Sequence, residues 1–143
     1  MVDTFVVGFD GTASAKRAVQ HAASQAKTGS GTVHLVHVLE WSPYSFLTPE
    51  ELSERHKRRE DELARAKAIV QPIVDDLKSK GINATCEVRH GHAGELLCEI
   101  AENMQARQIV IGRTGSTSIA ARLMGSLALT LVQASPVPVT VVP

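Results

Sequence analysis

The stretch TFVVGFDGT, residues 4–12, decides the fold class of this 143-residue chain. It begins with an apolar run, Thr4–Phe9, that has no alternating polar face, which is typical of a strand buried on both sides. Asp10-Gly11-Thr12 then ends the strand, and Ala13–Lys27 has apolar residues at helical spacing. A buried strand followed directly by a helix indicates an α/β domain.

The same alternation of strand and helix patterns continues to the end of the chain. Pro72 is expected to kink or divide a long charged helix. Because helix-length connections separate the strands, parallel pairing is expected. The sequence predicts further strands at Thr32–Leu39, Asn83–Arg89, Gln108–Ile111 and Val137–Val142, and further helices at Pro49–Lys80, Gly94–Gln105 and Leu127–Gln133.

The composition is that of one ordinary globular domain spanning residues 1–143. Lys plus Arg and Asp plus Glu are 15 each, so the formal net charge is zero and the basic excess of a nucleic-acid-binding protein is absent. No apolar run approaches the roughly 20 residues of a membrane span. Cys86 and Cys98 read as buried free thiols, which suit a reducing compartment. We therefore expect a cytoplasmic protein with no nucleic-acid partner and no membrane insertion.

Two glycine-containing loops follow apolar strands. The first is Gly8–Thr12, and the second is Gly112-Arg113-Thr114-Gly115, followed after nine further residues by Gly125-Ser126. Glycines allow close backbone approach to a ligand, and the N-terminus of the helix that starts near residue 126 favours a phosphate. Both loops face one crevice if their strands are neighbours where the strand order reverses. This predicts a five-stranded parallel sheet of order 3-2-1-4-5, Rossmann-like or flavodoxin-like, with helices on both faces.

The spacing Gly112-x2-Gly115-x9-Gly125-Ser126 resembles the nucleotide motif of the universal stress protein family. Val7–Thr12 is similar to the first strand and acidic turn of that family, His37-Val38 to the end of its second strand, and Pro136–Val139 to its closing strand. The resemblance thus covers the whole chain. It implies the ATP-binding type, with ATP, or ADP or AMP, as ligand and Mg²⁺ or Mn²⁺ on the phosphates rather than on protein side chains.

The resemblance also implies a role for individual residues. Asp10 would contact the ribose, and the backbone of Val38 would read the edge of the adenine. Phe9 and Ile111 would form the walls around the base. The residues that would hold the ribose and phosphates, largely through backbone groups, are Gly112, Thr114, Gly115, Gly125, Ser126 and Leu127.

Two positions depart from the family pattern. Arg113 precedes Thr114, whereas the family has the small residue first and a basic residue or His second. The inverted order allows Arg113 to point away from the phosphates. Ala128 replaces a frequent hydroxyl residue, which removes one phosphate hydrogen bond and allows AMP or ADP to compete with ATP.

The candidate site offers Asp10 as its one carboxylate, and the sequence has no Walker A lysine loop and no GxSxG motif. We therefore expect a stress-response or regulatory protein rather than an enzyme, with slow ATP hydrolysis at most. Nucleotide occupancy would modulate a dimer or the binding of a protein partner. Two alternatives stay open: an ATP-using enzyme such as a hydrolase or nucleotidyl transferase, and a dimeric scaffold without nucleotide.

The last predicted strand, Val137–Val142, is expected at an edge of the sheet. Pro138 cannot donate a hydrogen bond to a neighbouring strand, and the other residues are apolar without a protective Lys. Such an edge invites pairing with a second chain. The family resemblance likewise implies a homodimer in which this strand pairs antiparallel across a two-fold axis.

Overall fold

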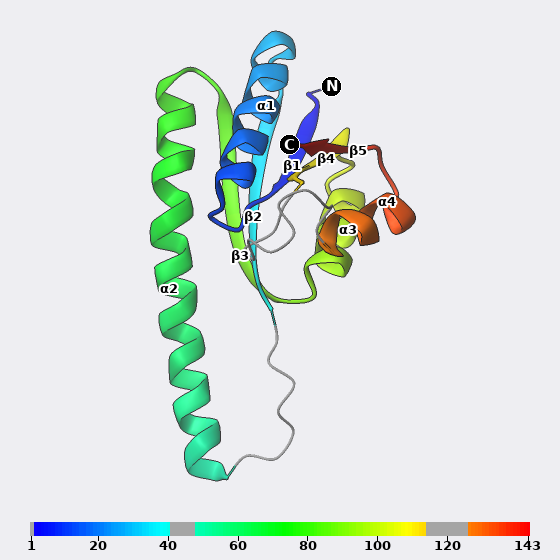
Figure 1. Cartoon of the computed structure of the whole chain (residues 1–143). Helices are drawn as coiled ribbons and strands as arrows, with labels where there is room; N and C mark the ends of the chain where they lie inside the picture. Colours follow the sequence, from blue (N-terminus) through cyan, green and yellow to red (C-terminus); the bar gives the residue numbers. More distant parts are fainter. Residues whose placement is uncertain (1, 41–47, 114–125) are drawn as a thin grey trace.

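The computed structural model describes residues 2–40, 48–113 and 126–143. Strands and helices alternate along these residues, as Figure 1 shows. The strands are β1 (Thr4–Gly8), β2 (Thr32–Glu40), β3 (Asn83–Gly91), β4 (Gln108–Gly112) and β5 (Val139–Val142). The helices are α1 (Ala13–Gly29), α2 (Pro49–Ser79), α3 (Ala93–Asn103) and α4 (Ser126–Ala134).

The strands form one parallel sheet in the order β3-β2-β1-β4-β5, which confirms the predicted fold. β1 is central: Val6 pairs with His34 of β2 on one side and with Ile109 of β4 on the other. The chain passes outward through β2 and β3 and then crosses back to β4 and β5, so the strand order reverses between β1 and β4. The carboxyl ends of strands at such a point are where α/β proteins bind ligands.

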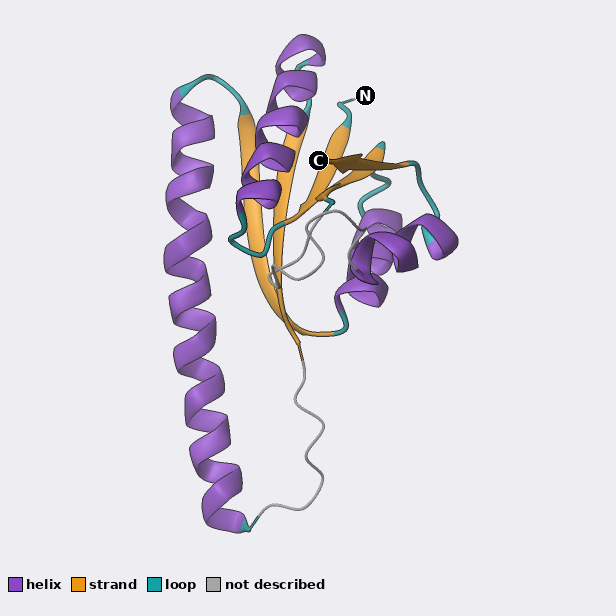
Figure 2. Ribbon diagram, viewed as in Figure 1, coloured by secondary structure: helices purple, strands orange, loops and turns teal. Residues whose placement is uncertain are grey.

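Helices cover both faces of the sheet (Figure 2). α1 and α2 pack against one face, and α3 and α4 pack against the other. Val7 lies in the core beneath α1 and α2, and its neighbour Val6 lies in the core beneath α3 and α4. Both side chains are fully buried. Because strand side chains alternate between the faces, β1 must be apolar at every position that is covered.

Helix α2 runs unbroken through Pro72, so the predicted division at this proline is wrong. The proline is exposed, while Val70 and Val74 on either side are buried against the sheet. This packing holds the helix together despite the missing backbone hydrogen bond. The first half of α2 extends beyond the sheet (Figure 1). Neither α2 nor any other described helix is long and apolar enough to cross a membrane.

Candidate functional site

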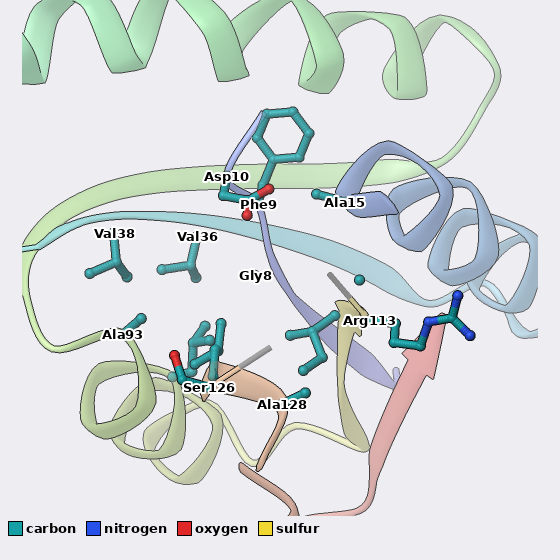
Figure 3. Close-up of a pocket in the computed structure, with 14 residues that line it drawn as sticks. Gly8, Phe9, Asp10, Ala15, Val36, Val38, Ala93, Arg113, Ser126 and Ala128 are labelled. Atoms are coloured by element: carbon teal, nitrogen blue, oxygen red, sulfur yellow. The ribbon is translucent and has the colours of Figure 1, made fainter. Parts of the chain in front are cut away.

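A pocket opens at the carboxyl ends of β1 and β4, on the face of the sheet that α3 and α4 cover (Figure 3). Gly8 ends β1 and Gly112 ends β4, so the pocket lies where the strand order reverses. Side chains from β2, α3 and α4 complete it. The described residues that line it are Gly8, Phe9, Asp10, Ala15, Val36, Val38, Ala93, Leu97, Ile111, Gly112, Arg113, Ser126, Leu127 and Ala128.

Apolar side chains form the walls of this pocket. Val36 and Val38 of β2 point into it from one side (Figure 3). Ile111 of β4 and Leu97 of α3 also line it. The enclosed space is about 120 Å³, which is less than the roughly 300–1,000 Å³ of most ligand pockets. A second hollow of about 310 Å³ adjoins it and shares Ala93, Ser126 and Leu127. The apolar pocket therefore suits a flat ring, with the polar remainder of a ligand outside it.

Asp10 shapes the turn between β1 and α1. Its Oδ1 accepts hydrogen bonds from the backbone N–H of Thr12 at 3.0 Å and from the Thr12 hydroxyl at 2.6 Å. Thr12 is in turn the N-cap of α1, where its Oγ1 accepts from the N–H of Ala15 at 3.1 Å. Gly11 between them has φ +83°, a conformation that favours glycine. The other oxygen, Oδ2, has no hydrogen-bond partner among the described residues and is available to a ligand hydroxyl.

The ring of Phe9 does not wall this pocket. It is buried in the core beneath α1 and α2 and points toward α2 in Figure 3, so only the backbone of Phe9 borders the pocket. The reason is strand alternation: Phe5, Val7 and Phe9 share one face, and Gly8 lies on the other. His37 Nδ1 lies 2.6 Å from the Phe9 carbonyl oxygen, which only accepts, so Nδ1 carries a proton and donates it.

Gly112 allows β4 to pack closely against the start of α1. A Cβ at this position would lie 2.7 Å from the carbonyl carbon of Ser14 and 2.9 Å from the backbone nitrogen of Ala15. Gly8 is similarly confined, because a Cβ there would lie 3.0 Å from Leu97 Cδ1. Both glycines thus have a packing role in addition to any contact with a ligand.

The first turn of α4 borders the pocket through Ser126 and Leu127. Arg113 reaches the pocket only with its inner part, because its guanidinium lies over β5, away from Val36, Val38 and Ser126 (Figure 3). Ala128 is fully buried behind them. Three predicted residues, Thr114, Gly115 and Gly125, lie outside the described residues.

The adjoining hollow lies between Glu40 at the end of β2 and the first turns of α3 and α4. Glu40 Oε1 accepts a hydrogen bond from the N–H of Ala93 at 3.2 Å, which caps the first turn of α3 with a carboxylate. His92 Nδ1 is 3.8 Å from Glu40 Oε2. No group of three or more His, Cys, Asp or Glu residues suited to a metal ion occurs in the part of the chain that the structure describes.

Several lining residues were not predicted from the sequence, among them Val36 and Leu97. Val36 lies two residues before Val38 on the same strand, so the period of two in β2 was a signal that places both on one face. Leu97 had no comparable signal, because its contact with Gly8 depends on how α3 packs across the sheet.

Comparisons with known proteins agree on one family. The Universal stress protein family matches residues 1–143. A universal stress protein of Methanocaldococcus jannaschii is 29% identical over 140 residues, which are 96% of this chain and 79% of that protein.

Solved structures show the same fold. A universal stress protein from Lactobacillus plantarum superposes with a TM-score of 0.86 at 21% identity, covering 99% of this chain and 97% of that one. A universal stress protein in complex with cAMP has a TM-score of 0.69 at 25% identity, covering 99% of this chain and 96% of that one.

Proposed function

The chain belongs to the universal stress protein family, and on this premise we propose that it binds an adenine nucleotide, first of all ATP, in the pocket between β1 and β4. The observation that carries the proposal is that apolar walls, the open Oδ2 of Asp10 and the first turn of α4 border one pocket. A purine, a ribose hydroxyl and a phosphate require these three surfaces. The relative in complex with cAMP supports the same class of ligand.

The proposed roles follow the position of each residue in the pocket. The base lies between Val36, Val38 and Ile111, with the backbone of Val38 at its edge, so Val36 takes the place expected of the Phe9 ring. Asp10 accepts a hydrogen bond from the ribose. The backbone of Gly112, Ser126 and Leu127 faces the ribose and phosphates, and Thr114, Gly115 and Gly125 act with them.

We propose that Mg²⁺ or Mn²⁺ binds through the phosphates of the nucleotide. Arg113 is the one cationic residue among the described residues that line the pocket, and its guanidinium points away. A divalent cation would supply the positive charge that the phosphates need, with its remaining ligands provided by water.

We propose a regulatory role rather than a catalytic one. Asp10 is the one carboxylate among the lining residues described, and its Oδ1 is already engaged in the turn. Nucleotide occupancy would instead modulate a homodimer that pairs through β5, or the binding of a protein partner. β5 supports this proposal because it is an edge strand whose three valines are partly exposed.

Calorimetric titration with ATP, ADP and AMP in the presence of magnesium tests the proposal. Asp10→Asn keeps the oxygen that accepts from Thr12 and replaces only the open Oδ2, so the turn is retained. We expect it to weaken ATP binding by roughly tenfold or more, as for a lost hydrogen bond to a charged group. Asp3→Asn is the matched control, because Asp3 lies before the opposite end of β1 and contacts Arg107.

The same titration separates the alternatives. If nucleotide-free wild-type protein binds none of the three nucleotides, the scaffold hypothesis replaces this one. If it binds ATP and also releases phosphate steadily, with turnover lost in Asp10→Asn, the protein is an ATP-using enzyme. Binding without steady turnover is the result that we expect.

A further inference from the structure

A separate cavity of about 490 Å³ lies between α1 and α2, on the opposite face of the sheet from the nucleotide pocket. The two helices lie side by side there in Figure 1. The floor of this cavity, called the α1–α2 groove below, consists of buried or partly buried apolar side chains. These are Phe9, Val19, Ala23, Ile73, Leu77 and Ile82.

The rim of the α1–α2 groove is basic. Lys16 and Lys27 of α1 and Lys80 after α2 line it, against the single carboxylate of Asp76. Lys80 Nζ is 3.0 Å from Asp76 Oδ2. Lys16 and Lys27 make no ion pair with any residue that the structure describes. The groove therefore combines an apolar floor with a net positive rim.

Two of the lysines lie at one end of the α1–α2 groove, and the third lies at the other end. α1 and α2 both run back from the carboxyl ends of the strands, so Lys27 and Lys80, near their final turns, lie at the same end. Lys16 lies in the first turns of α1, near Phe9, at the other end. Three helical turns, about 16 Å, separate Lys16 from Lys27, which is close to the length of an extended dodecanoate.

We propose that the α1–α2 groove binds a fatty acid anion, with its carboxylate at Lys27 and Lys80 and its hydrocarbon chain along Val19, Ile73 and Leu77 toward Phe9. Burial of the chain against this floor provides the affinity, because each methylene removed from water contributes favourably. The lysines select an anionic head over a cationic one. Phe9 is the one residue that lines both this groove and the nucleotide pocket, and the other groove residues lie apart from that pocket.

Titration with dodecanoate below its micellar concentration tests this proposal, with dodecyltrimethylammonium as the probe of opposite charge. Ile73→Glu places a carboxylate on the groove floor, and Ile69→Glu places one a single turn earlier on α2, at a side chain that is 52% exposed and outside the groove. We expect saturable binding of dodecanoate, its loss in Ile73→Glu and its retention in Ile69→Glu.

A second pair of variants leaves the core untouched, in case Ile73→Glu fails to fold. Lys27→Glu should weaken dodecanoate binding about fivefold, since exposed charge pairs are individually weak. Lys57→Glu makes the same change at an exposed position outside the groove and should have no effect. The proposal is overturned if dodecanoate shows no saturable binding, if dodecyltrimethylammonium binds as tightly, or if Lys57→Glu weakens binding as much as Lys27→Glu.

Discussion

The two oxygens of the Asp10 carboxylate have different surroundings. Oδ1 is bound to the N–H and hydroxyl of Thr12, and the hydroxyl of Thr12 caps α1 through the N–H of Ala15. One short polar chain thus joins the end of β1, the turn and the first turn of α1. The Asp10 side chain, which faces the pocket, is therefore held in place by the start of α1, the helix that follows it.

Removal of this cap should destabilise the protein. Thr12→Ala loses both the N-cap and a partner of Asp10, and we expect a loss of about 1 kcal/mol or more of unfolding free energy in urea. Thr28→Ala is the matched control on the same helix, where the hydroxyl donates to the Ser24 carbonyl near the C-terminal end. A loss in Thr28→Ala as large as in Thr12→Ala would contradict the capping role.

Gly112→Ala should also destabilise the protein, with or without nucleotide. The added methyl group meets the backbone of Ser14 and Ala15, which cannot move without shifting α1, so we expect a cost of about 1–3 kcal/mol. Gly29→Ala is the control, because a Cβ there meets nothing within 4 Å. Thermal unfolding of both variants checks this prediction. Equal melting temperatures would contradict it, because they would show that a Cβ at residue 112 is accommodated without cost.

The two cysteines should react slowly with alkylating reagents. Burial raises the pKa of the Cys86 thiol and of the Cys98 thiol above their ordinary value. The thiolate fraction near neutral pH is therefore smaller in the folded protein than in the unfolded chain, and alkylation should rise only at higher pH than for a free thiol. The raised pKa also makes the free energy of unfolding depend on pH. The folded protein holds the thiol protons more tightly than the unfolded chain does, so this contribution to stability is complete below the unfolded pKa and is lost as pH rises through the folded pKa.

Iodoacetamide labelling followed by mass spectrometry, with and without denaturant, measures this difference. Equal rates at pH 8 in both conditions would contradict it.

At the scale of secondary-structure elements, strand and helix types follow from local sequence. The apolar runs in β1 and β4 predict buried strands because both faces of the sheet are covered. Pro72 shows the limit of such reasoning, because packing of Val70 and Val74 on the sheet overrides a local helix breaker. Phe9 shows the opposite case: the alternation in β1 already indicated the direction of its side chain, but the family resemblance implied that its ring would form a wall around the base.

The edge strand β5 should mediate self-association. Val141→Lys adds a charge to an apolar strand edge, a device by which proteins prevent pairing, so we expect the dimer to dissociate. Sedimentation velocity at micromolar concentration measures the change, and Val2→Lys, at a side chain that is 58% exposed before β1, is the control. A wild-type monomer, or a dimer unchanged by Val141→Lys, would exclude pairing through β5.

At the scale of the whole molecule, the sheet separates the nucleotide pocket and its adjoining hollow from the α1–α2 groove, which has a different chemistry. The strand order places Gly8, Val38 and Gly112 at one rim, and sequence spacing could anticipate this because carboxyl ends of parallel strands share an edge. The α1–α2 groove could not be anticipated, since it depends on how far apart two helices settle on the opposite face. Phe9 belongs to both places, with its backbone at the pocket and its ring in the groove.

The most direct test of the central claim is to map amide chemical shifts of the ¹⁵N-labelled protein during titration with ATP and magnesium. We predict saturable changes that centre on the ends of β1, β2 and β4 and the first turn of α4, with Gly8, Asp10, Val38, Gly112 and Ser126 among the affected amides. The groove residues Val19, Ala23 and Lys27 should change little. Absence of saturable changes, or changes centred on α1 and α2 instead, would contradict the nucleotide pocket proposed between β1 and β4.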